Sequence, residues 1–172
     1  MTSADRSVSR TILFALAAVG CANAFAVPTQ CQPEEDTLFS CKVDKKMVAV
    51  CASLGWSSQA GSLQYRFGPA ASAELVLPRA TKTVPSASAT ASSLMFSGGG
   101  GATLRFSSGK VDYVVYTAIS STWGDVSGVA VERGGKTMHV FKCRGKVTSM
   151  LGEALFRDAG FKRDDLPFEL PE

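Results

Sequence analysis

The stretch Leu38–Cys51 most constrains the fold, because it has the pattern of a β-hairpin and contains two cysteines. Two short runs of β-forming residues flank a polar turn at Asp44-Lys45. Apolar residues recur at alternate positions, beginning with Phe39 and Cys41, so one face of the hairpin is expected to be buried. The hairpin predicts an antiparallel sheet with one face toward a core.

Residues 1–26 have the pattern of a secretory signal peptide. Two arginines near the start precede an apolar run over Thr11–Val19, and small residues follow it. The apolar run is too short to stay in a bilayer as a permanent span. We expect cleavage after Ala24 or Ala26, which leaves residues 27–172 as a single exported domain.

Cys21 raises an alternative, because Ala18-Val19-Gly20-Cys21 is similar to the cleavage box of bacterial lipoproteins, where the cysteine is acylated. Ala18 stands where that box favours leucine, and an A-x-A cleavage site follows directly. The sequence therefore favours an exported protein in the periplasm or outside the cell over one with a lipid anchor at Cys21. No later segment is long and apolar enough to predict a membrane span.

The charge of the chain is nearly balanced, at +3 for 18 basic and 15 acidic residues. Cleavage of the signal peptide would leave sixteen basic and fourteen acidic residues, a charge of +2. So small a charge gives no basis for predicting nucleic-acid binding. A chain of the remaining length fits one domain that buries about 70% of its unfolded surface.

Four cysteines remain after cleavage, namely Cys31, Cys41, Cys51 and Cys143. An even number of cysteines in an exported domain predicts two disulfides. A zinc site would need closer ligand pairs such as C-x-x-C, and the chain has none. We therefore expect disulfides, no metal and no cofactor.

The hairpin turn decides which cysteine pairing is favoured. A turn at Asp44-Lys45 places Cys41 opposite Val48 and Cys51 opposite Leu38, which puts the two thiols on opposite faces of the sheet. A bridge between these two cysteines is therefore disfavoured. The expected pairs are Cys41 with Cys143 and Cys31 with Cys51.

Further short β-type runs follow the hairpin, separated by glycine, proline and serine turns. They lie at 62–67, 74–77, 94–96, 103–106, 111–119, 128–132 and 137–141. This spacing predicts a mainly β fold, an antiparallel sandwich or barrel of about eight short strands.

Two segments depart from the β pattern. Lys82–Ser93 has no periodicity and is expected to be a mobile surface loop. An apolar stripe at helical spacing predicts one α-helix near 149–159, capped by Thr148 or Ser149 and closed by Gly160.

Few residues are suited to catalysis. The single histidine, His139, lies in an apolar run and is expected to be an ordinary sheet residue. The acidic residues Glu34–Asp36 are expected to be solvated, and Gly98–Gly101 lack the ending of a phosphate-binding loop. We therefore expect a binding protein and not an enzyme.

The segment Ser107–Lys110 is the strongest candidate for a binding surface. It forms the predicted tip of a hairpin, where glycine permits close approach and hydroxyl and ammonium groups donate hydrogen bonds. Tyr113 follows and would add rigid contact area. Trp56 and Trp123 are further candidates for contact with a partner or ligand.

The order of these features resembles the bacterial periplasmic lysozyme inhibitors, and also other exported bacterial β-proteins without an assigned activity. The residues that carry the resemblance are Phe39-Ser40-Cys41, Lys46-Met47-Val48, Ser108-Gly109 with Tyr113, and Cys143.

The resemblance implies that Ser108, Gly109, Lys110 and Tyr113 bind a partner, with the tip at 107–110 occluding the cleft of a lysozyme. The alternative is an envelope protein that binds a small ligand or has a structural role, without catalytic activity. In that case Trp56 or Trp123 would line the mouth of the site.

Overall fold

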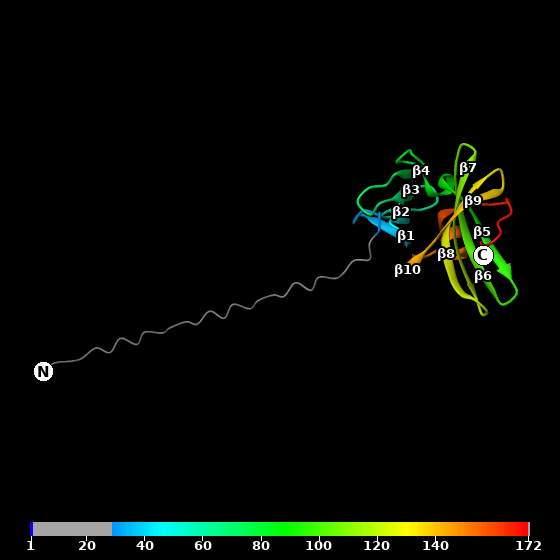
Figure 1. Ribbon diagram of the computed structural model, residues 1–172. Helices are drawn as coiled ribbons and strands as arrows, with labels where there is room; N and C mark the ends of the chain where they lie inside the picture. Colours follow the sequence, from blue (N-terminus) through cyan, green and yellow to red (C-terminus); the bar gives the residue numbers. More distant parts are fainter. Residues whose placement is uncertain (2–28, 172) are drawn as a thin grey trace.

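The computed structural model describes Met1 and residues 29–171, so the expected signal peptide and Cys21 lie outside the described residues. The described chain is mainly β-structure in two sheets that pack face to face (Figure 1). The predicted mainly β fold is confirmed, and of the two architectures expected, the described strands form a sandwich and not a closed barrel. None of the described helices is long and apolar enough to cross a membrane.

The first sheet has five strands in the order β10-β1-β2-β3-β4. Their bounds are β1 (Glu35–Val43), β2 (Lys46–Ser53), β3 (Leu63–Gly68), β4 (Leu75–Leu77) and β10 (Arg144–Ser149).

The second sheet has six strands in the order β11-β5-β6-β7-β8-β9. Their bounds are β5 (Thr90–Phe96), β6 (Gly99–Ser108), β7 (Val111–Ser120), β8 (Gly124–Arg133), β9 (Lys136–Lys142) and β11 (Lys162–Arg163). The described part of the chain therefore has eleven strands and not about eight, because β10 and β11 arise from segments with little β pattern in the sequence.

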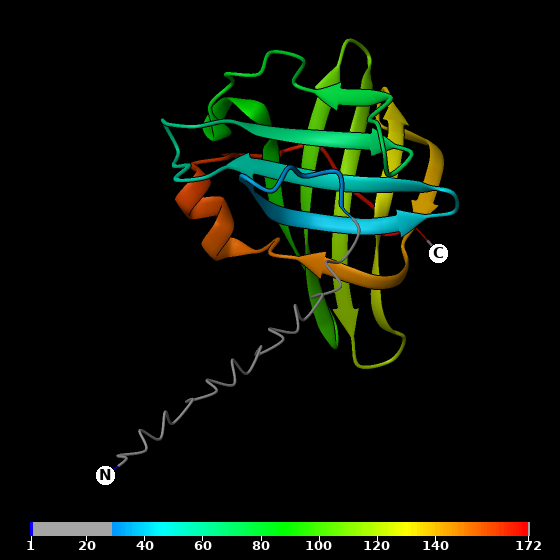
Figure 2. The same cartoon turned by 90° about the vertical axis from the view of Figure 1, so that its left-hand side faces the viewer.

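The strands of the two sheets cross steeply, as Figure 2 shows for β1–β3 in front of β5–β8. The core lies between the sheets, where alternate residues of facing strands interdigitate. Val48 and Val50 of β2 and Leu104 and Phe106 of β6 all belong to this core, and all four side chains are buried. Tyr65 of β3 packs on Phe106 with the ring centroids 5.5 Å apart.

The β1–β2 hairpin turns at Asp44-Lys45 as predicted, and Cys41 lies opposite Val48. A register shift between Thr37 and Phe39 places Cys51 opposite Thr37 instead of Leu38. Cys41 belongs to the core between the sheets, whereas Cys51 follows the core residue Val50 and so faces the other side. The shift therefore leaves the two thiols on opposite faces.

Two disulfides hold distant parts of the chain together. Cys31 is bonded to Cys51 and Cys41 to Cys143, which are the pairs favoured by the sequence. The second bond joins β1 to the point where the chain passes from β9 into β10, so it links the two sheets. Disulfides are typical of proteins in oxidising compartments.

The predictions for helix and loop need correction. The C-terminal helix α2 spans Glu153–Ala159 and not 149–159, because Ser149 still pairs with β1 as the last residue of β10. Gly160 ends α2 in a left-handed conformation with φ of 64°, as expected. The predicted loop Lys82–Ser93 contains the short helix α1 (Pro85–Ser88) and the start of β5.

Candidate functional site

The predicted binding tip lies where β6 and β7 join, at the end of two strands of ten residues each. Ser108 pairs with Val111, which leaves Gly109 and Lys110 as the two turn residues. Gly109 has a φ of 62°, a conformation that favours glycine, at the first position of the turn. Gly109 and Lys110 are exposed, and Ser108 is half-buried.

A chain of polar contacts braces this tip from below. The hydroxyl group of Ser107 donates a hydrogen bond to Asp112 Oδ1 at 2.6 Å, across the hairpin. The other carboxylate oxygen of Asp112 lies 3.7 Å from Arg105 Nη1, and Arg105 is one of the most buried charged residues described. Asp112 therefore connects the tip to the buried guanidinium group of Arg105.

Arg105 is the centre of a buried ionic cluster on the face of the second sheet away from the first. Its Nη1 donates to Glu132 at 2.5 Å and its Nε to Asp164 at 2.6 Å, and the three side chains are at most 4% exposed. Burial by itself lowers the pKa of the Arg105 guanidinium, but the hydrogen bonds to the two carboxylates outweigh it and the pKa is raised. Arg105 Nη2 is buried without a hydrogen-bond partner in the described part of the chain.

The cluster fastens the C-terminal tail onto the second sheet. The backbone amide of Asp164 also donates to the carbonyl oxygen of Ala91 at 2.8 Å. Farther along the tail, the ring of Phe168 packs on Tyr116, with centroids 5.7 Å apart. Burial raises the pKa of Tyr116 to about 12. In Figure 1 the tail, in red, lies on the side of the second sheet that faces away from the first.

This cluster was not predicted from the sequence. Asp164 lies in a short charged stretch after the predicted helix, yet it contacts a strand residue 59 positions earlier in the chain. One signal is visible in the sequence, because Arg105 stands between the apolar residues Leu104 and Phe106 inside a predicted strand. A charge in such a run is expected to have a partner, but the sequence does not identify it.

Several basic residues lie at the end of the second sheet that carries the tip. Val111, next to the tip, pairs with Arg133 of β8, and Arg133 pairs with Lys136 of β9. Arg133, Lys136 and Lys110 are all exposed, whereas the nearby carboxylate of Glu132 is buried against Arg105. The exposed charged residues of the β6–β7 and β8–β9 turns are therefore basic.

Tyr113 lies apart from the exposed tip. Its ring packs on Tyr65, with centroids 5.7 Å apart, and the side chain is half-buried against the core. Burial, with Tyr113 nearby, raises the pKa of Tyr65. Tyr113 thus supports the hairpin from the core side, and Ser108, Gly109 and Lys110 form the outer part of the predicted site.

The remaining candidate residues have structural partners. His139 is exposed, and its ring lies edge-on to Phe141 with centroids 4.3 Å apart. Trp56 packs against the core and donates from its indole nitrogen to Asp36 Oδ2 at 3.1 Å. Neither Asp36 nor Glu35 is simply solvated, contrary to expectation, because Glu35 forms an ion pair with Arg66.

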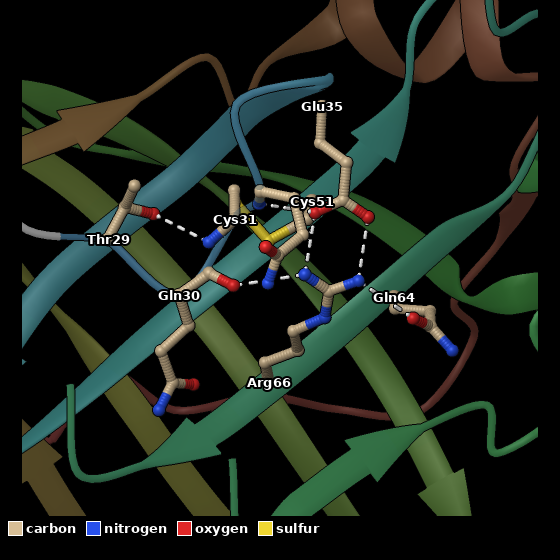
Figure 3. Close-up of a disulfide and its surroundings, with 8 residues drawn as sticks. Thr29, Gln30, Cys31, Glu35, Cys51, Gln64 and Arg66 are labelled. Atoms are coloured by element: carbon tan, nitrogen blue, oxygen red, sulfur yellow. Dashed lines mark hydrogen bonds and ion pairs between the residues drawn. A yellow bond between two sulfur atoms is a disulfide. The ribbon is translucent and has the colours of Figure 1, made fainter. Parts of the chain in front are cut away.

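The contacts of Glu35 and Arg66 hold the segment before β1 against the first sheet (Figure 3). Both carboxylate oxygens accept hydrogen bonds from Arg66, at 2.6 and 2.7 Å. Arg66 also donates to the backbone carbonyl of Gln30 at 3.0 Å, beside the Cys31–Cys51 disulfide. The two sulfur atoms and Glu35 lie close enough together for a metal site. Because both thiols are oxidised, they offer no thiolate ligands in this state.

An open groove of about 1200 Å³ lies beside β10, where β5–β8 extend beyond the first sheet. Trp123, Met95 and Ile119 contribute exposed apolar surface to it. The hydroxyl groups of Thr117 and Ser127, 3.0 Å apart, form part of its lining. Trp123 thus lines a groove, but this groove is open and lies outside the core.

Comparison with known proteins identifies no relative: no family model, no curated protein and no solved structure matches this chain.

Proposed function

We propose that this protein is exported to the periplasm or the cell exterior and binds another protein by inserting the tip Ser107–Lys110 into its cleft. Two disulfides and the signal-peptide pattern support the location. The resemblance to periplasmic lysozyme inhibitors makes a lysozyme the expected partner. The protein itself would act by occlusion and not by catalysis.

The chemistry of the tip suits a cleft that contains carboxylates. Lys110 carries an exposed ammonium group, Ser108 a hydroxyl group, and Gly109 adds no side chain that would hinder entry. Hydrogen bonds from such donors to ionised carboxylates are charge-assisted and strong. The neighbouring basic residues Arg133 and Lys136 would also attract an acidic cleft.

The observation that supports the proposal most strongly is the brace beneath the tip. Ser107 is held by Asp112, and Asp112 lies beside the buried Arg105. A loop that is already ordered loses less conformational entropy on binding. A solvated connecting turn would not require this support from a buried charge.

The test is an inhibition assay with the variant Ser108→Ala/Lys110→Ala. Lysis of a cell-wall suspension by c-, g- and i-type lysozymes is measured with and without the protein, and retention on each immobilised lysozyme is measured in parallel. We expect the unaltered protein to bind and inhibit one type, and the variant to lose both activities with little change in thermal midpoint.

Lys45→Ala is the matched control, because Lys45 is an exposed lysine in the two-residue turn of the β1–β2 hairpin. It should inhibit like the unaltered protein. Absence of retention and inhibition with all three lysozymes would remove the lysozyme assignment, and inhibition by the tip variant would remove the role of the tip.

The groove beside β10 favours a second candidate function, the binding of a small ligand such as a saccharide. Trp123 could stack on a sugar ring, and the hydroxyl groups of Thr117 and Ser127 could bind its hydroxyl groups. Titration with chitin oligosaccharides should then change the tryptophan fluorescence of the protein but not that of Trp123→Ala. Equal responses of the two proteins would eliminate this candidate.

A further inference from the structure

β9 forms an open edge of the six-stranded sheet. It is the last strand in the order of that sheet and pairs with β8 alone. At the opposite edge β11 has two residues, whereas β9 has seven, Lys136–Lys142. The first four of these residues are exposed. Within the described chain, no strand pairs with the outer side of β9, so this side presents backbone donors and acceptors to solvent.

This edge lies in the most uniformly basic part of the chain. Residues 133–146 contain no acidic residue, and five of them are lysine or arginine. These five are Arg133, Lys136, Lys142, Arg144 and Lys146, all with exposed side chains. The ion pair between Arg144 and Asp44, at 3.4 Å, lies at the surface, with both side chains more than 70% exposed. Such a pair is weak in water and leaves Arg144 accessible to another carboxylate.

Charge argues against a second copy of the same strand as the occupant of this edge. β9 is not regular: its pairing with β8 shifts register at Met138, a bulge that places Lys136 and Lys142 on opposite faces of the sheet. Two copies paired along this edge would still bring only basic side chains together, because residues 133–146 contain no carboxylate. Like charges directly opposite each other destabilise a strand pair. A strand with carboxylates on both of its faces would instead gain an opposite-charge pair with each lysine.

We propose that the β9 edge binds an extended, acidic segment of another protein as an added strand. The backbone of β9 would form hydrogen bonds with the added strand. Lys136 and Lys142 would select acidic side chains near the two ends of that strand. Arg144 and Lys146, which follow β9 in the chain, would extend the attraction beyond the strand. This surface shares Lys136 with the basic surroundings of the tip but includes no residue of the tip Ser107–Lys110, and the inference does not depend on the proposed function.

The experiment uses three synthetic probes with the whole protein. One peptide is a seven-residue strand of glutamate and valine with glutamates on both faces. The second has lysine in place of each glutamate. The third is the acidic peptide with alternate backbone nitrogens methylated, so that it keeps its charge but cannot form the hydrogen bonds of a strand pair. Binding is followed by hydrogen exchange of the β9 amides and by titration at low salt.

We expect the acidic peptide alone to slow exchange in β9. The variant Lys136→Glu/Lys142→Glu should bind it at least about tenfold more weakly and gain affinity for the basic peptide. The tip variant Lys110→Ala should retain protection of β9, which separates this surface from the proposed inhibitory site.

Three outcomes would overturn the proposal. Failure of the acidic peptide to protect β9 would show that the edge does not accept such a strand. Equal binding of the methylated peptide would show attraction by charge alone, without strand addition. Concentration-dependent dimers with β9 protected, found by sedimentation, would show that a second copy occupies the edge.

Discussion

Replacement of Arg105 by methionine tests whether the buried cluster holds the second sheet and the tail together. The substitution removes the positive charge that Glu132, Asp164 and Asp112 surround. Glu132 and Asp164 would then be buried carboxylates, each 4% exposed, without the guanidinium that binds them. An uncompensated buried charge is among the most destabilising changes in a protein.

The expected loss of stability follows from these contacts. Removing one partner from a buried ion pair costs about 3–5 kcal/mol. The same change removes Nη2 of Arg105, a buried donor without a partner, and thereby relieves about 1 kcal/mol. We therefore expect Arg105→Met to lower the free energy of unfolding by about 3 kcal/mol, which corresponds to a fall of about 10 °C in the thermal midpoint.

Urea unfolding followed by circular dichroism measures this loss. The triple variant Arg105→Met/Glu132→Gln/Asp164→Asn also removes the two carboxylate charges that would be left without a partner. It should recover more than half of the lost stability. Arg163→Met is the control, because the ion pair of Arg163 with Asp165 is 3.5 Å long and almost fully exposed. A loss below about 1 kcal/mol for Arg105→Met, or a triple variant as unstable as the single one, would refute the reasoning.

Two further predictions concern the disulfides and the buried tyrosines. Replacing Cys41 and Cys143 by alanine opens a loop of 102 residues and should cost about 4.7 kcal/mol, against about 3 kcal/mol for the Cys31–Cys51 loop of 20 residues, as measured by urea unfolding. The reverse order of these losses would contradict the loop-closure argument. Because burial raises the pKa of Tyr116 to about 12 in the folded state, the stability it contributes is present below pH 10 and is lost as the pH rises toward 12. Tyr116→Phe should therefore show a shallower fall in stability above pH 10, and an unchanged slope would eliminate this contribution.

Most of the first sheet and its cross-links could be predicted from the sequence, because the signals there are local. The Asp44-Lys45 turn sets the register of the β1–β2 hairpin, and strand alternation separates Cys41 from Cys51. The bulge near Leu38 was not predictable, since one extra residue in a strand leaves little trace in an alternating pattern. The pairing of the cysteines did not depend on it.

Only part of the candidate site could be predicted from the sequence. Glycine and lysine in a short polar turn identify the tip at Gly109-Lys110, because turn chemistry depends on adjacent residues. The strand β10 and the basic edge of β9 depend on which strands become neighbours, and sequence periodicity does not specify that.

The sequence by itself determined the β character of this protein, the positions of its tight turns and the faces on which its cysteines lie. These properties follow from interactions between residues a few positions apart. Only the tertiary structure decided that Arg105 and Asp164 meet across 59 residues, that the tail covers the second sheet, and that β9 remains an open edge. Such contacts arise because buried charges must find partners when the sheets pack, and the partner is whichever residue the fold brings near.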